Sequence, residues 1–120
     1  MEDRNAQGRD RVFQSLSWCK ISPPKGKSAD AFKNLVVAGT SGGLVKLIDL
    51  SKSKVLDVIQ AGEYETTVFG LDWNVDGLLA IGTSDENVQI KKFEPDSKTF
   101  CHISTIGTNS PCRCVAWNPL

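Results

Sequence analysis

The feature that most constrains this chain is an internal repeat with a period of 43 residues. The segment 35–50, LVVAGTSGGLVKLIDL, aligns with the segment 78–93, LLAIGTSDENVQIKKF, and both contain the tripeptide Gly-Thr-Ser. Each of the three Trp residues closes a similar stretch, a polar turn followed by a short apolar run, and Trp73 and Trp117 are 44 residues apart. A repeat of this length indicates small structural units that bury a face against their neighbours.

The local pattern within the repeat predicts strands. No long segment has the 3.6-residue spacing of a helix, whereas short runs of Val, Ile, Leu, Phe and Thr alternate with Gly, Asn, Asp and Ser. Gly42-Gly43 and Asp76-Gly77 mark tight turns between adjacent strands. The predicted strands, each end accurate to about two to four residues, are 12–18, 34–40, 44–50, 54–60, 67–73, 78–84, 87–94, 99–105 and 112–117.

One insertion interrupts the repeat. Trp18 and Trp73 are 55 residues apart, because the segment 19–34, CKISPPKGKSADAFKN, lengthens the first unit. This segment contains Pro23-Pro24, a Gly and four Lys, which is typical of a loop. Four short strands at this period, with the insertion set aside, indicate the blade of a propeller.

The residues resemble the blade pattern of the WD-repeat β-propeller family over about residues 8–120. The best match is the Ser-Gly-Ser strand of that pattern, which is Gly39-Thr40-Ser41 in one unit and Gly82-Thr83-Ser84 in the next. The family's signature pairs are degenerate, since its structural His is absent and its turn Asp survives as Asp85 only. The Trp-Asp register holds Ile48-Asp49 and Lys91-Lys92, and the Gly-His register holds Gly8-Arg9, Glu63-Tyr64 and Gly107-Thr108.

The resemblance implies an all-β fold, a partial β-propeller of antiparallel four-stranded blades. We expect a disordered N-terminal tail at 1–7 and a partial propeller at 8–120. The first blade covers about 12–60 with its loop insertion at 19–34, the second covers about 67–105, and the first strand of a third is at about 112–117. Propellers close with about four to eight blades, so two blades indicate a fragment of a longer propeller or a truncated gene model. Blades acquired by oligomerisation are the remaining explanation.

The same register predicts the core. Each Trp closes the innermost strand of a blade, and we expect the three Trp to be buried at equivalent positions. The predicted core of the second blade is Leu71, Trp73, Leu78, Ile81, Val88 and Ile90, and that of the first is Leu16, Trp18, Val37, Val45 and Leu47.

Composition excludes several classes of protein. Apolar residues make up 40% of the chain, too many for a disordered one, and 14 basic residues balance 14 acidic residues. No apolar run is long enough to span a bilayer, and the N-terminus lacks the apolar core of a signal peptide. We therefore expect an intracellular protein, cytoplasmic or nuclear, that has no membrane partner and whose four Cys are free thiols.

The reactive side chains do not form a recognisable catalytic or metal site. Cys101 and His102 are adjacent on a predicted strand and so point to opposite faces, which does not suit zinc. Cys112 and Cys114 align with Val68 and Gly70, where small buried residues fit. A triad of Ser84, Asp85 and His102 lacks an oxyanion hole, and the Gly-Thr-Ser-Gly-Gly at 39–43 lacks the Lys and helix of a phosphate loop. We predict no catalytic residue, no cofactor and no metal.

Two functions remain. The first is a non-catalytic scaffold that helps to assemble a multiprotein complex and binds proteins or peptides on its propeller face. The resemblance places the turns before the inner strands on that face, and Tyr and Arg are common in binding hot spots. The predicted partner-binding patch is Tyr64, Glu65, Asn109 and Arg113. The second is an RNA-binding propeller, since the inserted loop carries Lys20, Lys25, Lys27 and Lys33 against Asp30 alone.

Overall fold

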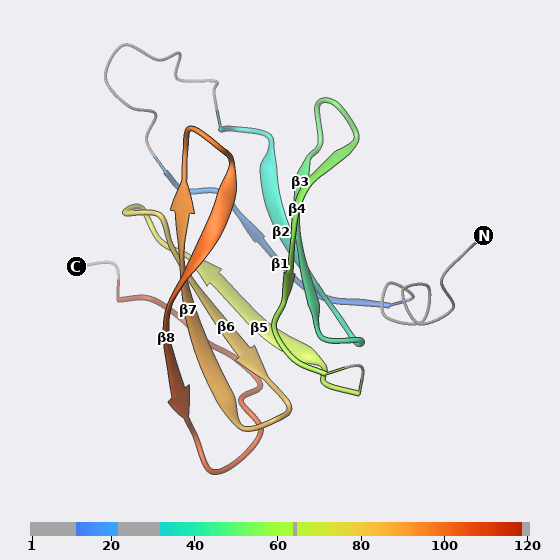
Figure 1. Cartoon of the computed structure of the whole chain (residues 1–120), viewed down its shortest axis with the longest axis vertical. Helices are drawn as coiled ribbons and strands as arrows, with labels where there is room; N and C mark the ends of the chain where they lie inside the picture. The colour runs from blue at the N-terminus through green and yellow to red at the C-terminus, as the bar shows by residue number, and fades with distance from the viewer. Residues whose placement is uncertain (1–11, 22–31, 64, 119–120) are drawn as a thin grey trace.

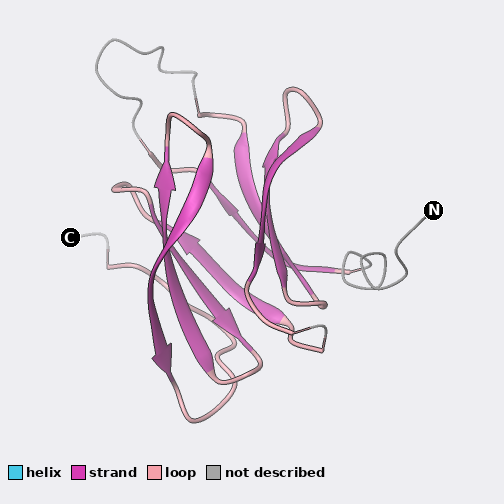
Figure 2. Ribbon diagram, viewed as in Figure 1, coloured by secondary structure: helices cyan, strands magenta, loops and turns pink. Residues whose placement is uncertain are grey.

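The computed structural model describes residues 12–21, 32–63 and 65–118, which form strands and loops (Figure 1, Figure 2). The strands make two antiparallel four-stranded sheets with the spatial orders β1-β2-β3-β4, called blade 1, and β5-β6-β7-β8, called blade 2. The predicted all-β fold with four-stranded antiparallel blades is confirmed. The strands are β1 Phe13–Trp18, β2 Leu35–Thr40, β3 Leu44–Asp49, β4 Lys54–Gln60, β5 Val68–Trp73, β6 Leu78–Thr83, β7 Asn87–Glu94 and β8 Thr99–Gly107.

Turn chemistry determines where the strands end. Gly43 and Gly77 have φ angles of 83° and 88°, a left-handed conformation that glycine adopts without strain. In the β5–β6 turn, the side-chain oxygen of Asn74 accepts hydrogen bonds from the amides of Asp76 and Leu78, each at 2.9 Å. Both predicted tight turns are confirmed, and the eight strands end within two residues of their predicted limits.

The core lies between the two blades. Val37, Val45 and Leu47 of blade 1 are at most 1% exposed and belong to the same buried cluster as Trp73 and Ile81 of blade 2. The ring of Trp73 packs edge-on against Phe93 at 5.4 Å between centroids, and at 5.3 Å from Phe100. The predicted core is therefore confirmed on these facing surfaces.

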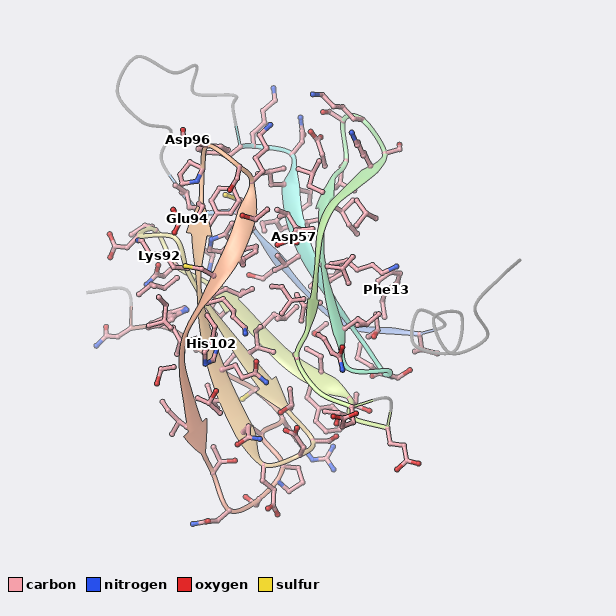
Figure 3. All side chains as sticks on the ribbon, in the orientation of Figure 1. Phe13, Asp57, Lys92, Glu94, Asp96 and His102 are labelled. Carbon is pink, nitrogen blue, oxygen red and sulfur yellow. The ribbon has the colours of Figure 1, made fainter. Side chains whose placement is uncertain are left out.

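Three further contacts join the blades outside the apolar core. On the outer strands, the Asp57 carboxylate of β4 accepts the amide of Phe100 on β8 at 3.0 Å (Figure 3). On the inner strands, Ser15 Oγ donates to the carbonyl of Val68 at 3.1 Å. Ser17 Oγ accepts the amide of Trp73 at 3.2 Å. The two sheets are thus joined both at their inner strands and at their outer strands.

The other face of blade 1 departs from the predicted core. Trp18 and Leu16 are 55% and 67% exposed, so the prediction that they are buried is wrong. Their side chains lie on the face of blade 1 away from blade 2, and no described residue covers them. A blade has two apolar faces, and each face becomes buried only when another unit packs on it.

The corresponding far face of blade 2 is partly covered. Leu78, Val88 and Ile90, which were predicted to be buried, are half-buried. The segment 108–118 runs over this face, and Trp117 is half-buried there. Residues 112–117 form no strand, which corrects the ninth predicted strand, because the described part of the chain offers no further strand to pair with them.

Several expectations fall outside the described residues. These are the N-terminal tail at 1–7, most of the inserted loop, and Tyr64. Within the described residues there is no helix long and apolar enough to cross a membrane.

Candidate functional site

Four connections lie together at one end of the sheets, the lower end in Figure 1, and we call them the rim. They are the β2–β3 turn (41–43), the described parts of the β4–β5 connection (61–63 and 65–67), the β6–β7 turn (84–86) and the segment 108–113 that follows β8. The amides of Ala61 and Gly62 donate to the carbonyl of Gly43 at 2.8 and 3.2 Å. These bonds place the turn before an inner strand beside a β2–β3 turn, as the sequence predicts.

Hydrogen bonds also join the rim connections of blade 2. Thr67 and Ser84 form a reciprocal pair: the amide of Thr67 donates to Ser84 Oγ at 2.9 Å, and the amide of Ser84 donates to the carbonyl of Thr67 at 3.0 Å. The amide of Thr108 donates to the carbonyl of Glu86 at 2.8 Å. The rim backbone is therefore held by hydrogen bonds that leave exposed side chains free to meet a partner.

A buried threonine organises the turn at the rim end of each repeat. Thr40 and Thr83 are both 0% exposed and both belong to the repeated Gly-Thr-Ser tripeptide. Thr40 Oγ1 accepts the amides of Gly42 and Leu44 at 3.2 Å each. The hydroxyl of Thr83 instead donates to the carboxylate of Asp85. In the first turn, two backbone amides are therefore the partners of the threonine hydroxyl. In the second turn, its partner is the carboxylate of Asp85, the turn Asp noted in the sequence.

The structure places three members of the predicted patch on rim elements. Glu65 is exposed in the β4–β5 connection, and Asn109 is exposed beyond β8 with a φ of 64°. The guanidinium of Arg113 lies 5.0 Å from the centroid of the Phe69 ring, a cation–π arrangement. Among the described residues, no hydrogen bond or ion pair joins Glu65 to the other two. Tyr64 lies outside the described residues, so the patch stays a prediction.

Asp72 is a connecting residue that the sequence reasoning missed. Its carboxylate pairs with Lys20 Nζ at 3.0 Å and accepts the amide of Trp117 at 2.6 Å, while its carbonyl accepts the Trp117 indole N–H at 2.7 Å. Burial acts to raise the pKa of Asp72, but the bonds from Trp117 and Lys20 outweigh it and hold that pKa below its usual value. The sequence signal that could have identified Asp72 is its position, since it directly precedes Trp73 as Ser17 directly precedes Trp18.

The residues considered for catalysis or metal binding contact separate partners. His102 lies on the exposed outer strand of blade 2 (Figure 3), with Nδ1 2.9 Å from Lys91 Nζ and Nε2 3.2 Å from Thr105 Oγ1. Burial lowers the pKa of Lys91. Cys101 Sγ donates to the Glu94 carboxylate at 3.3 Å. In the described part of the chain, no three His, Cys, Asp or Glu side chains gather as a metal site.

The cysteines after β8 differ from their predicted environment. Cys114 is exposed and Cys112 is half-buried, whereas both were expected to be small buried residues. Their backbone does lie over blade 2: a Cβ placed on Gly70 would be 2.9 Å from the Cys114 Cα. Among the described residues, no further sheet packs on the outer side of this segment.

The far face of blade 1 forms an apolar groove of about 260 Å³. Three of the large apolar side chains on this surface, Phe13, Leu16 and Trp18, are each more than half exposed. Figure 3 shows Phe13 on the side of blade 1 away from blade 2. We call this surface the open face; it is lined by Phe13, Leu16, Trp18, Val36, Ala38, Ile48 and Leu50.

Comparison with known proteins supports the architecture through structure alone. No model of a known protein family and no curated protein matches this sequence. A structure of U3-55K (TM-score 0.66, 13% identity) and a crystal structure of the RRP9 WD40 repeats (TM-score 0.66, 14% identity) each match over 87% of this chain and 31% of their own. A crystal structure of the mitotic checkpoint complex matches with a TM-score of 0.68 and 16% identity, over 89% of this chain and 30% of the other.

These likenesses define the class of fold. At 13–16% identity they show architecture and not activity. This chain has the fold of two consecutive blades of a WD-repeat β-propeller. It spans 30–31% of the length of the solved chains that it matches.

Proposed function

We propose that this chain is a non-catalytic interaction scaffold that contributes two blades to a larger WD-repeat propeller inside the cell, in the cytoplasm or nucleus. Its rim binds partner proteins or peptides and so helps to assemble a multiprotein complex. The observation that carries the proposal is the construction of the rim, whose backbone is fixed by hydrogen bonds between connections while Glu65, Asn109 and Arg113 remain exposed. A rigid frame that displays polar side chains binds without a large entropic cost of ordering.

The wider propeller is inferred from the open face. Monomeric soluble proteins seldom leave a large contiguous apolar patch exposed, and such patches mark interaction sites. Here that patch is one face of a blade, and the solved chains of this fold are about three times longer than the matched region.

RNA binding is less well supported. Of the four lysines that suggested phosphate contact, Lys20 is paired with Asp72 at 3.0 Å, which reduces the positive charge available near the insertion. Lys25 and Lys27 lie outside the described residues. The protein scaffold is therefore the function that we propose.

Purification of bound partners with the tagged chain tests the scaffold directly. Arg113→Ala combined with Tyr64→Ala should lose at least one protein partner, because the pair removes a cation and an aromatic ring from the predicted patch. Lys52→Ala, in the exposed β3–β4 turn at the opposite end of blade 1, is the matched control and should retain every partner.

Two outcomes would count against this function. If the double variant retains all partners of the wild type, the rim is not the binding surface. If the chain instead binds single-stranded RNA with an affinity that falls steeply with salt, and equally well in the rim variant, the RNA function replaces the scaffold.

A further inference from the structure

The open face of blade 1 has a filled counterpart in the same molecule. The repeat equates each residue of the open face with one in blade 2, at an offset of 55 residues for β1 and 43 for β2 and β3. Leu16 and Trp18 are 67% and 55% exposed, whereas their equivalents Leu71 and Trp73 are 9% and 0% exposed. Blade 1 itself covers the blade 2 residues. The equivalents of the open face are Val68, Leu71, Trp73, Leu79, Ile81, Lys91 and Phe93, of which all but half-buried Lys91 belong to the core.

A polar bond accompanies this apolar contact, and it occurs twice. Where blade 1 meets blade 2, Ser17 Oγ accepts the amide of Trp73 at 3.2 Å. Where blade 2 meets the segment 112–117, the Asp72 carboxylate accepts the amide of Trp117 at 2.6 Å. Ser17 and Asp72 each precede the Trp of their own repeat. The acceptor of one repeat therefore binds the Trp amide of the next, and we call this bond the latch.

A glycine contact is repeated in the same register. A Cβ on Gly39 would lie 2.4 Å from Val68 Cγ1, and a Cβ on Gly82 would lie 2.9 Å from Cys112 Sγ. Gly39 and Gly82 are equivalent in the repeat, as are Val68 and Cys112. The segment 112–117 thus sits on blade 2 as β5 sits on blade 1, although it forms no strand.

The position of that segment can be taken by β1 of another molecule. Residues 13–18 end in Trp, as 112–117 do, and they are already part of a four-stranded blade. A docked blade would bury the apolar side chains of the open face, whereas the segment alone leaves Leu78, Val88 and Ile90 half-exposed. Burial of apolar area therefore favours the exchange.

We propose that the open face of blade 1 binds blade 2 of a second copy of this chain, head to tail. The amide of Trp18 replaces that of Trp117 at the Asp72 carboxylate of the partner copy, and Leu16 and Trp18 become buried. This proposal rests on the proposed function, because it names the source of the adjoining blade. The contact is heterologous and forms a ring when its rotation closes, in which case about two to four copies supply the four to eight blades of known propellers.

Sedimentation of the full chain over concentrations from about 1 μM to about 1 mM tests the assembly. We expect a concentration-dependent shift from monomer to oligomer. Trp18→Ser should weaken association about tenfold or more, as the loss of a central aromatic residue does at other interfaces. Lys52→Ser is the control, since Lys52 is exposed in the β3–β4 turn at the end of blade 1 and does not line the open face, and it should leave association unchanged.

The indole N–H signals in two-dimensional NMR spectra report the orientation. On assembly, the signal of Trp18 should shift as its ring is covered, and the signal of Trp117 should move as its bond to the Asp72 carbonyl is released. Trp73, buried throughout, serves as the internal reference.

Three results would overturn the inference. A monomer at every concentration means that the adjoining blade comes from elsewhere. Association in which Trp117 keeps its signal means that two open faces pack on each other, without the latch. Equal weakening by Lys52→Ser means that the contact is not at the open face. None of these results bears on the rim, which the Arg113 variants test separately.

Discussion

Removal of the same side chain from equivalent positions of the two blades should change the free energy of unfolding by very different amounts. Trp73 is 0% exposed and packs on Phe93 and Phe100, whereas Trp18 is 55% exposed on the open face. Trp73→Ala leaves a large cavity between the blades and should destabilise the fold by about 3–5 kcal/mol. Trp18→Ala removes a side chain that is largely hydrated already and should change the free energy of unfolding by about 0.5 kcal/mol or less.

Urea unfolding followed by circular dichroism measures both values. With a slope of about 2 kcal/mol per molar urea, typical of a chain of this size, Trp73→Ala should lower the midpoint by about 2 M, whereas Trp18→Ala should leave it nearly unchanged. The samples are kept dilute so that association through the open face does not contribute.

A third variant keeps the comparison informative if Trp73→Ala does not fold. Trp73→Phe retains a ring against Phe93 and removes an indole N–H that is buried without a hydrogen-bond partner among the described residues. It should therefore destabilise the protein much less than Trp73→Ala. Similar losses for Trp18→Ala and Trp73→Ala would refute the assignment of the two faces.

Two further predictions concern the contact between blades. Gly39→Ala should destabilise the fold by about 1–3 kcal/mol in the same urea assay, because its Cβ would lie 2.4 Å from Val68 Cγ1 and 2.6 Å from Ser15 Oγ. Asp72→Asn should lose stability at neutral pH, and its difference from the wild type should shrink in acid. Because the folded-state pKa of Asp72 is lowered, its stabilisation is complete above about pH 4 and is lost as the pH falls through that lower value.

Matched controls separate these effects from general sensitivity. A Cβ on Gly107 meets no atom within 4 Å, so Gly107→Ala should be nearly neutral. Asp96→Asn changes an exposed carboxylate in the β7–β8 turn and should show no comparable loss at neutral pH. If Gly39→Ala destabilises the protein no more than Gly107→Ala does, the inferred close approach of the two blades at Gly39 is wrong. If the Asp72→Asn difference does not change with pH, the ionised carboxylate does not stabilise the fold.

Most of the fold was predictable because its signals are local. The Gly-Thr-Ser tripeptides, the Asn74 turn and the alternating apolar runs act within a few residues, and they placed eight strands within two residues of their limits. The repeat then grouped these strands into two blades. The segment 112–117 has the same local pattern but forms no strand, because a strand requires a partner and that requirement is not local.

The candidate site was less predictable. The sequence placed Glu65, Asn109 and Arg113 on the rim through the family pattern, but it did not indicate the stacking of Arg113 on Phe69. Nor did it indicate Asp72 as the acceptor for Trp117. Both contacts join β5 to a segment more than forty residues later, and only the packing of the blades brings these segments together.

By itself, the sequence determined the period, the strands, the turns and the class of fold, since each depends on residue type and spacing. The tertiary structure decided which of the equivalent apolar faces is buried. Trp18 and Trp73 stand at the same position of the repeat and in the same local context, yet one is exposed and the other is at the centre of the core. The physical reason is that a surface becomes buried only when a second surface packs against it. Blade 1 covers the face of Trp73, while no described residue covers the face of Trp18.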